Sequence, residues 1–418
     1  MPITAPATPS SGRTPAPQAP AVPDSGPRPL VPGSPLARAL YEVWRGRPVT
    51  IIQAPPGSGK STLIADIVDH LAARTDLVID VCAFTRDATV SVAGRIAEQV
   101  GPSKVVCTVS GWPTEALPED VASPSEAHDI SNPVKVGTLA SRARNRTGEA
   151  DLLIIDEAYQ ATFDLVSAAA NTATQVLLVG DPGQIGPVVT TNTIAWDHLR
   201  MGPHMRAPEV FAQREDAISI QMDATFRLGP LSTSIVAPLY DFDFACARPE
   251  RHVIDAAEVE VLKVPRTDDP YSLETAKLVA KRAASFVGRT LVEADGSQTL
   301  LSSTDVAVVV SHNAQQSAIE GTLSRLGIVG VSVGTADRLQ GGQWHVVVAL
   351  DPLLAKDSAS SHSLSSGRLC VMLSRHMTHL SWVTDGAWQD SLTQESDLDA
   401  SEVAKGRAVR EMIEQVAA

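Results

Sequence analysis

Apolar and polar positions along this chain separate short strands from amphipathic helices. Leu63, Ile64, Ile67 and Leu71 recur at the spacing of one helix face within residues 60–73. Continuous apolar runs, typical of buried parallel strands, occupy residues 49–53, 77–84, 104–108, 151–155 and 175–179, and again 306–310, 327–333, 345–350 and 380–384. Strands that alternate with helices in two such groups predict an α/β fold with two parallel sheets.

Changes in composition divide this pattern into segments. Residues 1–35 hold 11 of the 29 prolines, and such a segment cannot bury enough apolar surface to offset its ordering entropy. We therefore expect a disordered arm over residues 1–35, either a plain tether or a polyproline tail that binds a protein partner. Gly229, Pro230 and the irregular stretch 241–250 interrupt the later alternation. The expected segments after the arm are a first domain over 36–228, a second domain over 229–395 and a C-terminal helix in 396–418, with Val409, Met412, Ile413 and Val416 on its apolar face.

Length and composition narrow the class of protein. A chain of 418 residues is long enough for two or three domains. No stretch approaches the roughly 20 unbroken apolar residues of a membrane span, and the N-terminus lacks the features of a signal peptide. We therefore expect a cytoplasmic protein without membrane contact. The four cysteines are far apart and form no CxxC pair, which favours reduced thiols over a zinc site or disulfides.

The net charge of −14 argues only weakly against a nucleic-acid partner. A compact chain of this length has a radius of gyration of about 22 Å, whereas the Debye length in physiological salt is about 8 Å. A bound strand would therefore respond to local patches of charge rather than to the net charge.

Residues 49–62 (VTIIQAPPGSGKST) carry the strongest chemical signal. A strand leads into a glycine-rich turn, a lysine and two hydroxyls, which is the phosphate-binding pattern G-x-x-x-x-G-K-S/T with Ala54 in place of the first glycine. Such a turn points backbone N–H groups at one spot, at the positive end of the following helix. Lys60 would reach the β- and γ-phosphates of ATP, and the Ser61 hydroxyl would bind Mg²⁺. The expected nucleotide-binding residues of the loop are Pro56, Gly57, Ser58, Gly59, Lys60, Ser61 and Thr62.

A pair of carboxylates supplies the second half of the predicted site. LLIIDEAYQ (152–160) places Asp156 and Glu157 at the C-terminal end of a buried strand. An aspartate there can hold Mg²⁺, and the adjacent glutamate can orient and deprotonate the attacking water. Two carboxylates after four apolar residues could instead cap the following helix, but the lysine loop favours the catalytic interpretation.

Six segments together resemble the motifs of superfamily 1 helicases. LLIIDEAYQ with VLLVGDPGQIGP (176–187) resembles motifs II and III, whose patterns are DEAxQ and GDxxQ. TFRLGPLSTSIVAPLYDF (225–242) resembles the Y/F-R-M-x-P segment that begins the second motor domain in the nonsense-decay branch. SHNAQQ (311–316), VSVGTADRLQGGQ (331–343) and RLCVMLSRHM (368–377) resemble motifs IV, V and VI. With the phosphate loop, the motifs span residues 50–377 in the family's order.

The resemblance implies two RecA-like domains, with ATP in the cleft between them and single-stranded DNA or RNA across their tops. It implies that Gln184 senses the γ-phosphate and that Arg227 and Arg375 are presented to that phosphate by the second domain. Gln340 and Gly341 would couple the cleft to the strand. Candidate contacts to the nucleic-acid backbone are Thr85, Arg86 and Thr138, although loop polarity explains these residues almost as well.

The chain also departs from the resembled motifs. Gln343 stands where motif V usually has glutamate, and Met372 and His376 replace small alanines of motif VI. No counterpart of the adenine-reading glutamine lies between residues 30 and 48. The run SRARNR (141–146) is either a basic patch or a solvated turn.

We thus expect an ATP-dependent helicase or translocase on single-stranded nucleic acid. An ATP-gated protein that clamps nucleic acid or a partner without unwinding is the alternative. A P-loop ATPase that acts on proteins is disfavoured by the order of the motifs. The residues suit DNA and RNA equally, since backbone tracking and stacking serve either one.

Overall fold

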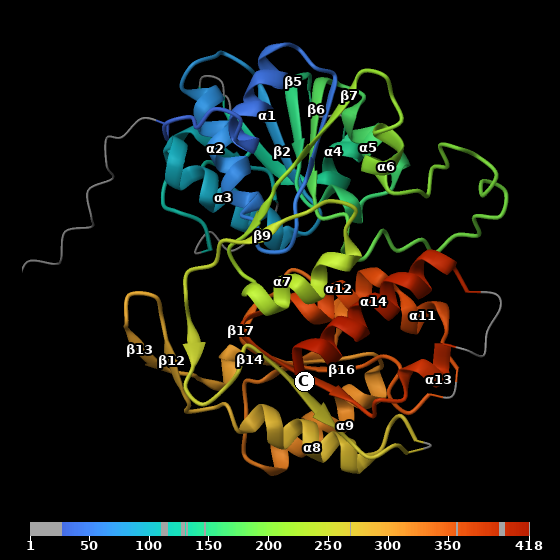
Figure 1. Ribbon diagram of the computed structural model, residues 1–418. Coiled ribbons are helices and arrows are strands. Elements are labelled where there is room, and N and C mark those ends of the chain that lie inside the picture. The colour runs from blue at the N-terminus through green and yellow to red at the C-terminus, as the bar shows by residue number, and fades with distance from the viewer. Residues whose placement is uncertain are drawn as a thin grey trace, which may run out of the picture.

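Two parallel sheets, which lie one above the other in Figure 1, build the protein. The computed structural model describes residues 27–417 except 110–115, 127–129, 131–132, 146–147, 268, 357 and 393–397. Most of the expected N-terminal arm therefore lies outside the described residues. Near its end, Arg28 forms an ion pair with Asp66, and Ser34 caps the first helix.

The first sheet contains seven strands whose neighbours all run parallel. Their order is β3 (Val105–Cys107), β4 (Val134–Thr138), β2 (Ile79–Ala83), β5 (Ala150–Ile155), β6 (Ala173–Gly180), β1 (Val49–Gln53) and β7 (Ala217–Gln221). Because β6 lies between β5 and β1, the loops that follow these three strands meet at one edge of the sheet.

Helices cover both faces of the first sheet (Figure 1). One face packs against α1 (Pro35–Trp44), α2 (Lys60–Ala72) and α3 (Arg86–Val100). The other face packs against α4 (Leu139–Asn145), α5 (Phe163–Ala170) and α6 (Ala207–Phe211). Successive residues of β1 serve the two cores in turn, since Ile51 belongs to one and Ile52 to the other. Burial on both faces explains the continuous apolar run of this strand.

The second sheet contains five parallel strands, in the order β11 (Val259–Lys263), β17 (His376–Thr384), β16 (Trp344–Leu350), β14 (Val306–Val310) and β15 (Ser332–Thr335). One face packs against α7 (Pro230–Val236), α12 (Ser366–Ser374) and α14 (Ala400–Ala417), and the other against α8 (Leu273–Ala284) and α9 (Asn313–Arg325). The shorter elements are β8 (Ala224–Thr225), β9 (Ala245–Cys246), β10 (His252–Val253), β12 (Thr290–Val292), β13 (Gln298–Leu300), α10 (Ala336–Leu339), α11 (Ser361–Leu364) and α13 (Trp388–Leu392). The predicted α/β fold with two parallel sheets is confirmed.

Some predicted element boundaries are wrong for identifiable reasons. The strands β4, β7 and β11 were not predicted, because polar residues interrupt the apolar runs of all three (VKVGT, AISIQ and VEVLK). The strands β7 and β11 lie at sheet edges, whereas β4 lies between β3 and β2. The strand β15 begins at Ser332 rather than at residue 327, because Gly327 and Gly330 adopt φ angles of +73° and +102° that no strand uses. Leu228 already packs in the core of the second sheet, so the chain leaves the first core between β7 and α7.

Over its described part, residues 141–145, the SRARNR run is helical and not a solvated turn, while a basic patch stays a prediction for the exposed Arg144, which lines a cavity with Arg86. These residues belong to α4, and the Arg142 side chain is buried. Its guanidinium forms an ion pair with Asp80 and donates to the carbonyl of Ala169. Within the described residues, no helix is long and apolar enough to cross a membrane.

The helix predicted over residues 401–417 forms α14 and is attached to the second sheet by a buried ion pair. Val409 and Ile413 are buried, as the apolar face predicted. Between them, Arg410 Nη2 lies 2.6 Å from Asp351 Oδ1, at the end of β16, and both side chains are almost fully buried. This pair places α14 against α7 and α12.

Arg410→Ala should lower the free energy of unfolding by about 3–5 kcal/mol, because it leaves the Asp351 carboxylate buried without its cation. The double variant Arg410→Met/Asp351→Asn should recover most of this loss, since no uncompensated charge remains. Chemical denaturation of both variants measures the difference. A loss below about 1 kcal/mol in the single variant would contradict a structural role for this pair.

Candidate nucleotide site between the two sheets

The glycine-rich loop joins β1 to α2 at the edge of the first sheet that faces the second. Gly57 and Gly59 adopt φ angles of +71° and +86°, which L-residues with side chains rarely tolerate. Gly59 is the N-cap of α2 and offers no side-chain cap, so the first N–H groups of that helix remain available to an anion. Ala54 is fully buried, and its N–H donates to the carbonyl of Gly180 at 2.9 Å. Position 54 therefore continues the strand, which is why alanine can replace glycine there.

The hydroxyls of the loop differ in their contacts. Ser58 Oγ is buried without a hydrogen-bond partner among the described residues. Thr62 Oγ1 accepts from Arg95 at 2.9 Å. Ser61 lines a cavity of about 530 Å³ together with Asp156, Glu157, Gln340 and Gly341. The loop thus shares one cavity with residues of both sheets.

The two carboxylates lie opposite the lysine. Asp156 is buried at the end of β5, and Glu157 adopts the left-handed conformation with φ +53°. Lys60 Nζ lies 3.8 Å from Glu157 Oε1. Burial, together with the adjacent Glu157 carboxylate, raises the pKa of Asp156 to about 7. Ser61 and Asp156 offer the hard oxygen donors that Mg²⁺ takes, and a cation here would offset the crowding of negative charge.

The turn after β6 connects the two sheets. Asp181 is fully buried, and its carboxylate accepts from the Gly183 N–H, from Gln184 Nε2 and, at 2.7 Å, from the hydroxyl of Tyr240 on the second-sheet side. Burial raises the pKa of Asp181. Gln184 Oε1 in turn accepts from Gln340 Nε2 at 3.4 Å. Asp181 and Tyr240 were not singled out in the sequence, because nothing local marks Tyr240 as a partner.

Arg227 lies directly against the glycine-rich loop. A Cβ atom on Gly57 would lie 2.2 Å from Arg227 Cβ. Two hydrogen bonds hold this approach, from Thr225 Oγ1 to the Pro56 carbonyl at 2.6 Å and from the Phe226 N–H to the Gly57 carbonyl at 2.9 Å. A glycine is therefore required at position 57 by contact as well as by backbone angle.

Arg375 lies beside Arg227 at the C-terminal end of α12. Arg375 is only 2% exposed, and Arg227 Nη1 donates to the Ser374 carbonyl at 3.2 Å. Both Nε atoms are buried without a partner, and among the described residues neither guanidinium has a carboxylate within ion-pair distance. Burial and the neighbouring Arg375 lower the pKa of Arg227. Arg227 thus lies against the loop, and Arg375 lies beside it, where its guanidinium donates to the Gly342 carbonyl and the Ser374 hydroxyl at 3.4 Å each. Two neighbouring cations near the loop are the electrostatic complement of a bound polyphosphate.

The residues predicted to contact single-stranded nucleic acid follow strands of the first sheet, and only some of them line the nucleotide cavity. Thr85 lines that cavity, whereas Arg86 and Thr138 line a separate one of about 460 Å³. The hydroxyls of Thr85 and Thr138 accept backbone N–H groups at the starts of α3 and α4, so both threonines also have a structural role. Phe84, which is 40% exposed, lines both cavities and was missed, although an aromatic at the end of a strand was a usable signal.

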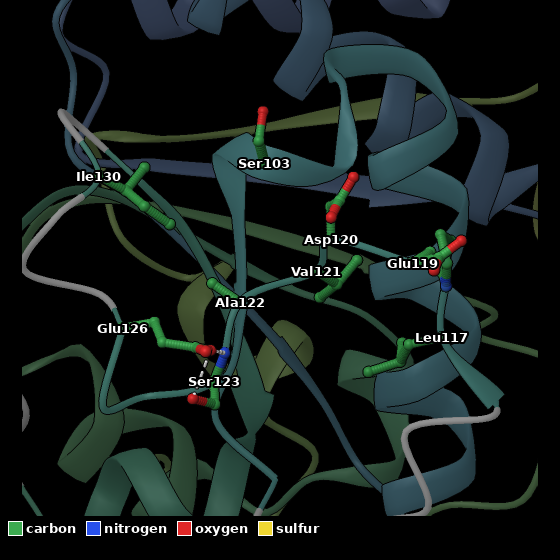
Figure 2. Close-up of a pocket in the computed structure, with 10 residues that line it drawn as sticks. Ser103, Leu117, Glu119, Asp120, Val121, Ala122, Ser123, Glu126 and Ile130 are labelled. Carbon is green, nitrogen blue, oxygen red and sulfur yellow. Dashed lines mark hydrogen bonds between the residues drawn. The ribbon is translucent and has the colours of Figure 1, made fainter.

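A further cavity of about 1030 Å³ lies elsewhere on the first sheet, beside β3 (Figure 2). Its lining includes Glu119, Asp120 and Glu126, and Glu126 accepts from the Ser123 hydroxyl and N–H. Among the described residues that line this cavity, none is Lys, Arg or His.

Comparison with known proteins agrees with this geometry. Residues 37–214 match the model of the AAA domain family. This stretch, which includes β1 to β6 and the glycine-rich loop, is similar to AAA-type P-loop NTPase domains, a class that binds nucleotide at such a loop.

Solved viral helicases are similar to 84–85% of this chain at low identity. Arterivirus nonstructural protein 10, a helicase, shares 13% identity with this chain at a TM-score of 0.48. The match covers 84% of this chain and 62% of that one. The same helicase in complex with DNA shares 14% identity with a TM-score of 0.49, at 85% coverage of this chain and 64% of that one. The PRRSV helicase shares 16% identity with a TM-score of 0.43, at 84% and 55% coverage. This chain thus spans less than two thirds of the helicase chains that it matches.

Gly57→Ala should open the contact between the two sheets, whereas Gly59→Ala should not. Both variants force a side chain into the left-handed region, at a cost of about 1–2 kcal/mol. Only Gly57→Ala also meets Arg227, since nothing lies within 4 Å of a Cβ at Gly59. Small-angle scattering should show a larger radius of gyration for Gly57→Ala alone. Equal radii for the two variants would contradict the close approach.

Proposed function

We propose that this protein is an ATP-dependent helicase or translocase on single-stranded nucleic acid, of the superfamily 1 type and similar to its nonsense-decay branch. The observation that carries the proposal is the pair Arg227 and Arg375, for which the described residues offer no carboxylate within ion-pair distance. Arg227 lies against the phosphate loop, and Arg375 lies beside Arg227 on the side of the second sheet. A P-loop NTPase that only binds nucleotide needs no such pair. Two arginines that meet the loop from a second parallel sheet suit hydrolysis controlled by the closure of the two halves.

The side chains around the loop divide the work of hydrolysis. Lys60 and the N–H groups at the start of α2 hold the phosphates, and Glu157 takes the proton of the attacking water. When bound at Ser61 and Asp156, Mg²⁺ would neutralise charge on the phosphate oxygens. Arg227 and Arg375 stabilise the charge that develops on the γ-phosphate, an effect worth about 10³–10⁵ in rate. Gln184, through Gln340, reports the state of this phosphate to the second sheet.

The bound single-stranded nucleic acid would run along the edge of the first sheet that carries Phe84, Thr85, Arg86 and Thr138. Phe84 is the exposed aromatic that joins this edge to the nucleotide cavity. Base stacking on an aromatic ring is tolerant of sequence, which suits a motor that moves along any strand. Gln340 and Gly341 line the nucleotide cavity together with Phe84, Thr85 and Ser61.

Hydrolysis of ATP by the purified protein should rise at least about tenfold with single-stranded DNA or RNA, since strand contacts favour the closed state in which both arginines act. Steady-state ATPase assays with a DNA homopolymer, an RNA homopolymer and no strand measure this. Lys60→Ala should abolish all three rates and serves as the control for contaminating activity. A rate that no strand changes would contradict the proposal. Stimulation without strand displacement would favour an ATP-gated clamp.

Arg375→Ala should reduce the strand-stimulated kcat by about 10³ and leave the KM for ATP within several-fold, because its charge acts in the transition state. Thermal melting separates this catalytic loss from a loss of stability, because Arg375→Ala also removes the hydrogen bonds to the Gly342 carbonyl and the Ser374 hydroxyl. Arg407 is an exposed arginine of α14, on the side of the second sheet. The matched control Arg407→Ala should leave kcat unchanged. Steady-state kinetics and thermal melting test both parts. Near-normal stimulated turnover in Arg375→Ala would contradict the two-sided site.

A further inference from the structure

Three side chains form a hydrogen-bonded chain behind the two arginines. Ser232 lies in the first turn of α7, Glu258 precedes β11, and His376 directly follows Arg375. Ser232 Oγ lies 2.7 Å from His376 Nε2 and 2.5 Å from Glu258 Oε1. His376 is fully buried and Ser232 nearly so.

The donors of this chain can be assigned from its neighbours. The Glu258 carboxylate also accepts the N–H groups of Ser232, at 2.7 Å, and Leu231, at 3.4 Å. It therefore acts as an acceptor throughout and takes the single hydroxyl hydrogen of Ser232. The Ser232 oxygen is then left to accept from His376, which must carry its hydrogen on Nε2.

His376 is therefore a neutral donor in one fixed tautomer. Its Nδ1 is buried without a partner, as expected of the nitrogen that bears no hydrogen. Burial, with His379, Arg248 and Arg227 nearby, lowers the pKa of His376 to about 3.

The hydrogen-bonded chain joins the two segments that carry the arginines. Glu258 accepts the first N–H groups of α7, the helix that begins shortly after Arg227. Gly229 makes room for this carboxylate, since a Cβ there would lie 2.4 Å from it. His376 attaches the other segment to the same helix, and the bond from Arg227 to the Ser374 carbonyl closes the ring. A shift of either segment would thus displace both guanidiniums.

We propose that His376, with Ser232 and Glu258, is a positioning residue that holds Arg227 and Arg375 in one geometry against the phosphate loop. The inference rests on the proposed function for its kinetic consequence. It also accounts for a departure noted in the sequence, because alanine, the usual residue of motif VI at position 376, could not make this bond. The imidazole touches neither the loop nor the phosphates, and it acts through the arginines.

His376→Ala should lower kcat for ATP by about 10²-fold, the size of effect expected when a catalytic group is misplaced by about 1 Å. The KM for ATP should stay within several-fold. His376→Gln should restore most of the rate, because its amide can donate to Ser232 from nearly the same place. Ser232→Ala should lower kcat in the same direction and removes only one oxygen atom. His345→Ala, which removes a half-buried histidine from the neighbouring strand β16, is the control with unchanged kcat.

The decisive comparison removes both arginines that His376 is proposed to position. If His376 acts through them, the triple variant His376→Ala/Arg227→Ala/Arg375→Ala should have nearly the kcat of Arg227→Ala/Arg375→Ala, because the loss is then not additive. Losses of kcat that multiply would overturn the inference. A fall in kcat that only follows a lower melting temperature, and that His376→Gln does not reverse, would overturn it as well.

A measurement independent of activity separates this inference from the proposed function. In proton–nitrogen NMR of the whole protein, the Nε–H signals of Arg227 and Arg375, assigned from Arg→Lys variants, should shift or broaden in His376→Ala and recover in His376→Gln. Unchanged signals in His376→Ala would overturn the positioning role even if no strand stimulates hydrolysis. Absent strand stimulation with altered signals would overturn the proposed function alone.

Discussion

The contact between the backbone of Gly57 and Arg227 sets the relation between the two sheets. A single methyl group at position 57 would enter the Arg227 side chain, and hydrogen bonds from Thr225 and Phe226 to the loop carbonyls hold the approach on either side. Because this segment leads into α7 and the second core, the loop and the second half of the protein cannot be placed independently. The cavity that residues of both sheets line therefore depends on the contact between Gly57 and Arg227.

Buried charges of both signs make the nucleotide site electrostatically unfavourable in the absence of a ligand. On one side, burial and the neighbouring Glu157 raise the pKa of Asp156. On the other, Arg227 and Arg375 share a half-buried to buried space without a carboxylate partner among the described residues. A polyphosphate with a divalent cation would supply the charge that each side lacks. Under the proposed function, these unfavourable electrostatics would preorganise the site for its nucleotide.

The helix α12 transmits this arrangement through the second half of the protein. At its first turn, Gly367 lies so close to the turn after β6 that a Cβ would be 2.9 Å from the Gln184 carbonyl oxygen. Glu402, from α14, accepts the N–H of Ser366 at 2.5 Å at that same end. Its other end carries Arg375. The C-terminal helix, fixed by Asp351 and Arg410, therefore supports the helix that presents the arginine.

The sequence by itself determined the features that are local along the chain. Strands buried on both faces appear as apolar runs, and the phosphate loop and the Asp156–Glu157 pair are contiguous segments whose chemistry is visible in a few letters. The strands β4, β7 and β11 were missed, because polar residues interrupt their apolar runs (VKVGT, AISIQ and VEVLK).

Only the tertiary structure decided which distant groups became partners. It joined Tyr240 to Asp181, Arg142 to Asp80, and His376 to Ser232 and Glu258. No letter pattern marks these residues, since a buried polar group can be satisfied by any suitable partner that folding brings within reach. The role of His376 in particular could not be predicted, because a histidine in place of alanine has meaning only beside the hydroxyl that receives its hydrogen.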